Sequence, residues 1–315
     1  MTLDGDDLEL FAGSLRQAAE QHTGEALDAA LVELGWHDAL DFDPHAAVSR
    51  LFEAQGAVAA TSSALDQVVA HALGQELGDT TSVALPPVGR WAAPGLVEDG
   101  RLTVHGLSTS LRDSLLVVAR SGDQDVAVVV DPGGLETRPV RGIDPWFGLV
   151  EIQGEVDVEA TTTVDWSAAV ALAQLAVAHE VVGASRTALA LAREHALERI
   201  QFGQPIAQFQ AVRHKLAEAL VAVEASASVL DAAWLDRSPT VAAIAKATAG
   251  RNGRIVARHT QQVLAGIGFT TEHDLHRYLR RIFVLDQLFG SHPTLTKQLG
   301  EECLATRRLP PLLPL

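Results

Sequence analysis

Apolar side chains in the first 75 residues are spaced as in amphipathic helices. At 8–34 they recur every three or four positions and Gly24 interrupts the series, which predicts two helices. A second run, at 44–73, is rich in alanine and valine. Asp43 precedes it, where a side-chain oxygen can accept from the free amides of a first helical turn. The pattern predicts a small helical domain at 1–84.

The pattern changes at 85–95, where proline and glycine replace helix-forming residues. Short apolar runs follow, separated by glycine, aspartate and proline at close intervals: RLTVHGL, DSLLVVAR, DVAVVVD and LVEIQGEVDV. Runs of this length, rich in valine and leucine, are typical of strands joined by tight turns. They predict a compact antiparallel β-domain at 85–160.

Helical periodicity returns in four long runs, at 165–199, 208–235, 240–264 and 272–289. Because these exceed the average helix of ~11 residues, they predict a bundle rather than isolated surface helices. The fold class is therefore α+β, mainly α, with a C-terminal four-helix bundle at 161–315. The final RRLPPLLPL contains three prolines, which exclude a regular helix and predict either an ordered strap over an apolar surface or a loose end.

Charge and cysteine content narrow the classes of function. The formal net charge of −16 repels nucleic acid and anionic lipid, so neither is expected as a partner. No apolar run approaches the ~20 residues that cross a bilayer, and the first residues are acidic where a secretory signal is basic. With a single cysteine, Cys303, the composition predicts a cytoplasmic protein. The twelve histidines lack metal-type spacing, so no metal site is expected.

Two strings carry the functional signal: ALERIQFGQPIAQFQAVRHKLAEAL at 196–220 and HTQQVLAGIGFTTEHDLHRYLRR at 259–281. The first offers Arg199, whose guanidinium fork suits phosphate oxygens. The second contains a turn of small residues whose amides can approach a phosphate closely. Together with the order helical, β, helical, the two strings resemble the acyl-CoA dehydrogenase family.

The resemblance implies FAD as cofactor, with the adenosine end gripped by the C-terminal helices of a neighbouring subunit. Arg199 matches the arginine that reaches the pyrophosphate or adenosine, and Phe202 matches the aromatic that packs against adenine. The remaining implied contacts are Gln210, Gln262, Ala265 and Gly266. Ala265 stands where the family usually has glycine, and alanine has less backbone freedom there.

The catalytic base implied by the resemblance is missing. The family removes a proton next to a thioester carbonyl and passes a hydride to flavin, which needs a positioned carboxylate. In many members the base is a glutamate at the position held here by Phe289; in others it falls at Ala173, with Gln174 beside it. Glu180 is the one nearby substitute, although an inter-helix polar contact explains it equally well. The flavin-ring loop and the tryptophan-containing strand of the family also have no match at 82–120.

The chain keeps the residues implied to contact the adenosine of FAD but lacks the implied base. This combination favours a heteromer, because each chain of a homotetramer must supply both halves of the site. The leading hypothesis is the smaller subunit of an α2β2 acyl-CoA dehydrogenase, like the actinobacterial enzymes of steroid degradation, paired with a full-length dehydrogenase that supplies the flavin pocket and base. An acyl-CoA substrate, steroid-derived by analogy, and an electron-transfer acceptor would follow. The alternatives are a self-sufficient dehydrogenase that uses Glu180 and a non-enzymatic helical scaffold that has lost FAD.

Overall fold

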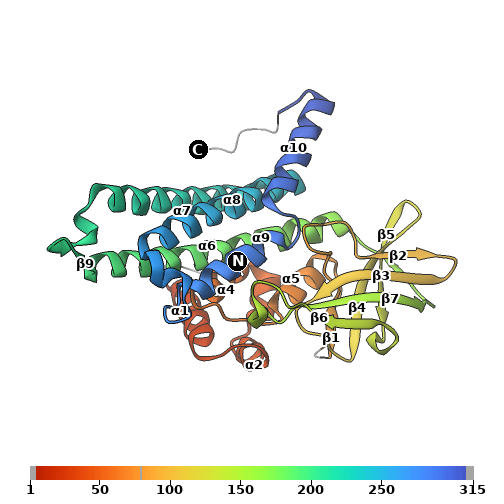
Figure 1. Ribbon diagram of the computed structural model, residues 1–315. Helices are drawn as coiled ribbons and strands as arrows, with labels where there is room; N and C mark the ends of the chain where they lie inside the picture. Colours follow the sequence, from red (N-terminus) through yellow and green to blue (C-terminus); the bar gives the residue numbers. More distant parts are fainter. Residues whose placement is uncertain (1–4, 79, 310–315) are drawn as a thin grey trace.

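The computed structural model describes residues 5–78 and 80–309, which form three parts (Figure 1). Short helices pack under the middle of a long C-terminal bundle, and a β-sheet lies at one end of that bundle. The order helical, β, helical that the sequence predicts is confirmed, as is the mainly α fold class.

The N-terminal part consists of five helices: α1 (Gly5–Gln21), α2 (Glu25–Glu33), α3 (Trp36–Phe42), α4 (Pro44–Val58) and α5 (Ala64–Ala72). Gly24 separates α1 from α2 with a φ of 61°, and Asp43 caps α4 by accepting from the Ala46 amide at 3.0 Å. The continuous run predicted at 44–73 is wrong, since Ala59 adopts a left-handed conformation with φ 55° and ends α4 before α5 begins.

The sheet contains eight strands: β1 (Thr81–Val83), β2 (Gly95–Glu98), β3 (Arg101–Ser108), β4 (Ser114–Ser121), β5 (Gln124–Val130), β6 (Glu136–Pro139), β7 (Val150–Asp157) and β8 (Thr162–Thr163). Their order is β6-β7-β3-β2-β4-β5-β8, with β1 also paired to β4. The expected purely antiparallel sheet is wrong, because β1 and β2 both run parallel to β4. β3 pairs with one edge of β2 as an antiparallel hairpin, and β4 pairs with the other edge of β2 in the parallel direction.

The C-terminal part contains the four predicted helices and one more: α6 (Trp166–Glu198), α7 (Gln210–Asp236), α8 (Pro239–Leu264), α9 (Leu275–Gln287) and α10 (His292–Thr306). The four-helix bundle is thus extended by α10, which packs against α8 and which the hydrophobic pattern did not predict. Its helix buries only Leu295, so it lacks a continuous apolar stripe. The predicted tail falls largely on residues 310–315, outside the described part of the chain.

Helix α6 is the central element of the core. It is long and apolar enough to cross a membrane by composition, but most of that window is buried inside the protein, as expected for a core helix. Close packing on α4 depends on two glycines: a Cβ at Gly183 would lie 2.2 Å from the Glu53 carbonyl oxygen, and one at Gly56 would lie 2.1 Å from that of Glu180. Larger residues at either position would push the two helices apart.

A buried carboxylate fastens the N-terminal helices to the sheet. Asp66 on α5 is fully buried and accepts from the Val83 amide at 3.2 Å and from the hydroxyls of Thr109 and Ser110 at 3.3 Å each. Burial raises the pKa of Asp66 to about 7, although these hydrogen bonds and Arg112 oppose the rise. The contact therefore depends on the protonation state of a single side chain.

We expect the stability of the protein to fall as pH rises from about 4 to about 7. The raised pKa means that the folded state holds the Asp66 proton over this range while the unfolded chain, with the ordinary pKa of 3.8, has released it. At about 1.4 kcal/mol per pKa unit, the loss is at most about 4 kcal/mol. Asp66→Asn should flatten this part of the profile of unfolding free energy against pH, measured by urea titration. The exposed control Asp231→Asn should keep the slope, and an unchanged slope in Asp66→Asn would contradict the assignment.

Candidate functional site

The first sequence block forms a short hairpin that projects from the end of α6. Strands β9 (Ile200–Gln201) and β10 (Gln204–Pro205) pair across the two-residue turn Phe202–Gly203, whose φ angles are 54° and 80°. Positive φ at both central residues is the geometry of a tight hairpin turn. It leaves Phe202 93% exposed, with its ring edge-on to that of Phe209 at 6.0 Å.

Arg199 lies at the base of this hairpin with an exposed side chain. Its backbone is fixed, since its amide donates to the His195 carbonyl at 2.9 Å and its carbonyl accepts from the Ile206 amide at 2.8 Å. Its guanidinium forms no ion pair with any residue in the described part of the chain, Glu194 and Glu198 included. Gln210 begins α7 nearby, exposed, with Nε2 3.3 Å from His214 Nε2.

The second block ends α8 and enters the 3-10 turn Ala265–Phe269, with Gln262 exposed on the last turn of α8. Ala265 adopts φ 50° and ψ −129°, a conformation that favours glycine, and its amide donates to the Gln261 carbonyl. That amide is therefore not free for a ligand. Gly266 is open instead, because a Cβ placed there would meet nothing within 4 Å.

The fold brings both blocks to one end of the bundle, opposite the sheet (Figure 1). Glu218 near the start of α7 pairs with His259 near the end of α8 at 3.0 Å, and His195 on α6 contacts His273 ring to ring at 6.3 Å. Apolar and cationic side chains cover this end: Ile200, Phe202 and Phe269, and the cations Arg193, Arg199, Arg213, Lys215 and Arg258, which form no ion pair among the described residues. Such a surface fits a ligand with a planar apolar part and phosphates.

The two positions that the resemblance assigns to a base are both buried. Phe289 is 1% exposed and its ring lies 6.4 Å from that of Trp166. Gln174 Nε2, from the turn of α6 that also carries the buried Ala173, donates to the Phe289 carbonyl at 3.0 Å. Neither Phe289 nor Ala173 offers a carboxylate.

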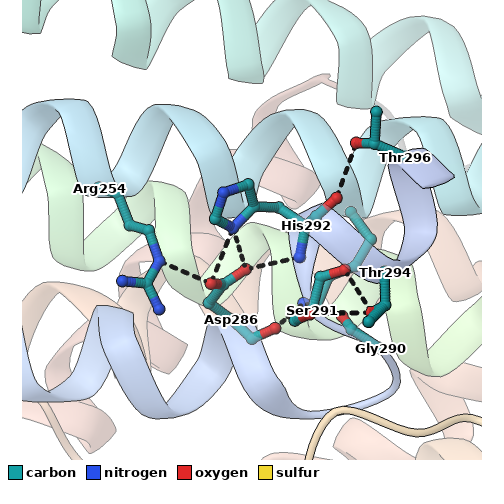
Figure 2. A network of polar contacts seen from close by, with 8 residues as sticks. Arg254, Asp286, Gly290, Ser291, His292, Thr294 and Thr296 are labelled. Carbon is teal, nitrogen blue, oxygen red and sulfur yellow. Dashed lines mark hydrogen bonds and ion pairs between the residues drawn. The ribbon is translucent and has the colours of Figure 1, made fainter.

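The turn that carries Phe289 is held rigidly from the other side. Lys246 is fully buried and donates to the carbonyls of Asp286 and Gly290, both at 3.1 Å, while burial lowers its pKa to about 8. Figure 2 shows the Asp286 carboxylate receiving Arg254 Nε at 2.8 Å and the His292 amide at 3.0 Å. No sequence motif indicates a role for Lys246. The sequence shows only that Lys246 is the one charged residue in the apolar run 241–250.

The linker before β2 packs against α6 and against the turn that carries Phe289. The Gly89 amide donates to the Gln287 carbonyl at 2.9 Å, and the Trp91 carbonyl accepts from Trp166 Nε1 at 2.9 Å. A Cβ at Gly290 would lie 2.9 Å from the Trp91 ring, so linker and turn are in close contact. Beside this contact a cavity of about 350 Å3 remains, with Trp91, Trp166 and Gln174 in its lining.

Glu180 takes part in a buried ion cluster and faces Arg281. Arg281 Nη1 donates to Glu180 Oε1 at 2.8 Å and Arg281 Nε donates to Asp144 Oδ2 at 3.0 Å, with all three residues buried. Burial raises the pKa of Glu180, and Arg281 opposes that rise. A base must reach the proton it removes, and these contacts instead favour the inter-helix polar role that the sequence left open.

Comparison with known proteins gives a consistent result. Residues 167–304 match the family model described as the acyl-CoA dehydrogenase C-terminal domain. The chain is 32% identical over 184 residues to acyl-CoA dehydrogenase IpdE2 of Mycobacterium tuberculosis, covering 56% of this chain and 57% of that protein. It is 35% identical over 132 residues to IpdE2 of Mycolicibacterium smegmatis, covering 42% of each. The chain thus spans about half the length of these curated relatives.

Solved structures match along nearly the whole chain. The ChsE4-ChsE5 complex from Mycobacterium tuberculosis gives a TM-score of 0.79 at 20% identity, covering 99% of both chains. The steroid ACAD Tcur3481-Tcur3483 gives 0.79 at 23% identity, covering 96% of this chain and 99% of that one. At these identities the likeness shows the fold alone, and it agrees with the sequence match in the C-terminal helices.

The C-terminal helices at 167–304 therefore match the C-terminal domain of acyl-CoA dehydrogenases in sequence, and the whole chain shares its fold with solved acyl-CoA dehydrogenases.

Proposed function

We propose that this chain is one subunit of a heteromeric, FAD-dependent acyl-CoA dehydrogenase. It supplies contacts to the adenosine and pyrophosphate of FAD across a subunit interface, while a full-length partner supplies the flavin pocket and the base. The observation that carries the proposal is a contrast between two ends of one bundle. Arg199 and Phe202 stand exposed, and Arg199 has no ion pair among the described residues, whereas the two base positions are buried and hold no carboxylate.

The exposed end suits the adenosine half of FAD. Arg199 offers an unpaired guanidinium for pyrophosphate oxygens, and Phe202 offers a nearly free ring for adenine. Gln210 and Gln262 add amides that can both donate and accept, and the open backbone at Gly266 permits close approach. Ala265 offers no backbone donor to FAD, because its amide already donates to the Gln261 carbonyl. FAD, when bound, supplies the hydride acceptor for α,β-dehydrogenation.

Two solved neighbours support the choice of partner and substrate. One solved neighbour is a complex of two different chains and another is described as a steroid ACAD. By this likeness we assign the chain to an α2β2 assembly that oxidises a bulky, steroid-derived CoA thioester and passes electrons to a transfer protein. A self-sufficient dehydrogenase would need Glu180 to leave Arg281, which would strand a buried charge at a typical cost of about 3–5 kcal/mol.

Purification with and without a partner tests the proposal directly. The chain alone should be colourless and inactive, and co-expression with a full-length dehydrogenase encoded beside it should give a yellow complex that oxidises a steroid-derived acyl-CoA. The measurements are flavin absorbance, subunit ratio and turnover with a dye acceptor. Stoichiometric FAD and turnover by the lone chain would support the self-sufficient alternative and refute the heteromer. A complex without flavin would support the scaffold alternative.

Arg199→Ala should weaken FAD binding in the complex by about 10- to 100-fold, the range expected for loss of charge-assisted hydrogen bonds. The measurement is the FAD concentration that restores absorbance and activity to the stripped complex. Arg251→Ala is the control, since Arg251 is an exposed arginine in the middle of α8 without an ion pair in the described chain. Equal retention of FAD by the two variants would remove Arg199 from the site.

Ala265→Gly should stabilise the isolated chain by about 1 kcal/mol. The change relieves a backbone conformation that typically costs about 1–3 kcal/mol in alanine, partly offset by the greater freedom of glycine when unfolded. Thermal unfolding measures the effect. Ala217→Gly, an exposed position inside α7, should instead destabilise by about 1 kcal/mol. A lower melting temperature for Ala265→Gly would show that no strain is stored there.

A further inference from the structure

Two histidine rings meet at the end of the bundle where the two sequence blocks come together. His195 lies on the last turn of α6, four residues before Arg199, and His273 lies in the loop between the 3-10 turn 265–269 and α9. Their ring centroids are 6.3 Å apart and the two rings are perpendicular. The contact therefore joins an imidazole from the helix that ends at Arg199 to an imidazole from the loop that follows Gly266.

The ring nitrogens of this pair are available to a ligand. Neither nitrogen of His195 has a hydrogen bond or an ion pair in the described part of the chain. His273 Nδ1 accepts from the Leu275 amide at 3.1 Å, which puts the ring proton on Nε2, and that N–H has no acceptor among the described residues. His259, at the same end of the bundle, differs because its Nε2 already pairs with Glu218 at 3.0 Å.

The charges around His195 favour its neutral form. Burial lowers the pKa of His195, and the neighbouring His273 and Arg199 lower it further, while the carboxylate of Glu198 opposes them. His273 in turn interacts with His276 on α9, which is surrounded by Arg280, Asp274 and Arg277. Cations thus outnumber carboxylates around the pair, so a bound anion would reverse the electrostatic effect on His195.

We propose that His195 and His273 join Arg199 in holding the pyrophosphate of FAD, and that His195 takes up one proton from solvent when FAD binds. This inference rests on the proposed function, because it concerns the same FAD site. Pyrophosphate oxygens accept hydrogen bonds and carry negative charge, so they favour donors and cations. His273 offers its Nε2 hydrogen without any change. His195 offers donors on both ring nitrogens only in its protonated form.

The proton goes to His195 because the second nitrogen of His273 is already in use. His273 Nδ1 holds the Leu275 amide, and protonation there would break that hydrogen bond. Both nitrogens of His195 are free of such contacts in the described chain. The solvent supplies the proton, a new N–H bond forms on His195, and no other covalent bond changes.

The proposal predicts that the affinity for FAD falls as the pH rises. At low pH His195 is protonated with and without FAD, and at high pH it is neutral in both states. Between its lowered pKa in the free chain and its raised pKa in the bound state, binding takes up a proton. Each pH unit in this window weakens binding by up to about tenfold.

The test measures FAD binding to the stripped complex rather than its turnover. Titration calorimetry at neutral pH, in two buffers with different ionisation enthalpies, should show uptake of up to about one proton. The dissociation constant, from recovery of flavin absorbance, should be about tenfold weaker at about pH 8 than at about pH 6. His195→Gln combined with His273→Gln should abolish both effects. His105→Gln is the control and should abolish neither, since His105 is an exposed histidine on β3, at the sheet end.

A second variant separates charge from shape. His195→Lys carries a permanent charge, so it should bind FAD tightly across the same pH range without proton uptake. Equal affinity at both pH values in the unaltered complex would overturn this inference and leave the proposed function standing. A pH dependence that persists in the double variant would overturn it as well. A complex that binds no FAD at either pH would overturn the proposed function and this inference together. Unfolding curves confirm that the compared samples are folded.

Discussion

One buried guanidinium joins the three parts of the molecule. Arg281 on α9 donates to Glu180 on α6, to Asp144 in the loop between β6 and β7, and to the carbonyls of Ala59 and Ala60 at the end of α4. Its face lies 4.6 Å from the Phe147 ring centroid. A planar group with five fixed donors can bind partners from several directions at once, which a lysine could not do with the same geometry. Loss of any one partner would leave a charge or carbonyl buried without compensation.

This cluster gives a structural role to Glu180, the carboxylate that the sequence offers as a substitute base. Glu180 and Asp144 together neutralise Arg281 and fix the position of the sheet relative to the bundle. The same structure seals the turn after α9, with Gln174, Lys246 and the Gly89 amide each satisfying a carbonyl of that turn. The middle of the molecule is thus organised for stability, in the region where the family resemblance implies a catalytic base.

The opposite end of the bundle is organised differently. There the polar side chains are exposed, several cations lack partners in the described chain, and Phe202 and Ala265 occupy backbone conformations that are unfavourable for their residue types. Strained and exposed groups of this kind reduce the stability of an isolated chain, and they persist where a binding partner uses them. The division of the molecule into a closed end and an open end is the physical basis of the proposed heteromer.

The sequence by itself determined the element types and the family signal. Apolar spacing predicted the long helices and most strands, because one face of each is buried, and the two strings named the residues that the fold gathers at one end of the bundle. It could not predict α10, whose burial is confined to Leu295, or the break at Ala59, where no glycine marks the turn.

Only the tertiary structure decided what the isolated polar residues do. Glu180, Lys246 and Asp66 each stand alone in an apolar run, and a lone charge has the same appearance in the sequence whether it is a base, a buried ion-pair partner or a clamp between domains. Their partners lie 101, 40 and 17 residues away, respectively, for the contacts to Arg281, Asp286 and Val83. Contacts over such separations are set by how the helices and the sheet pack, and local periodicity holds no information about them.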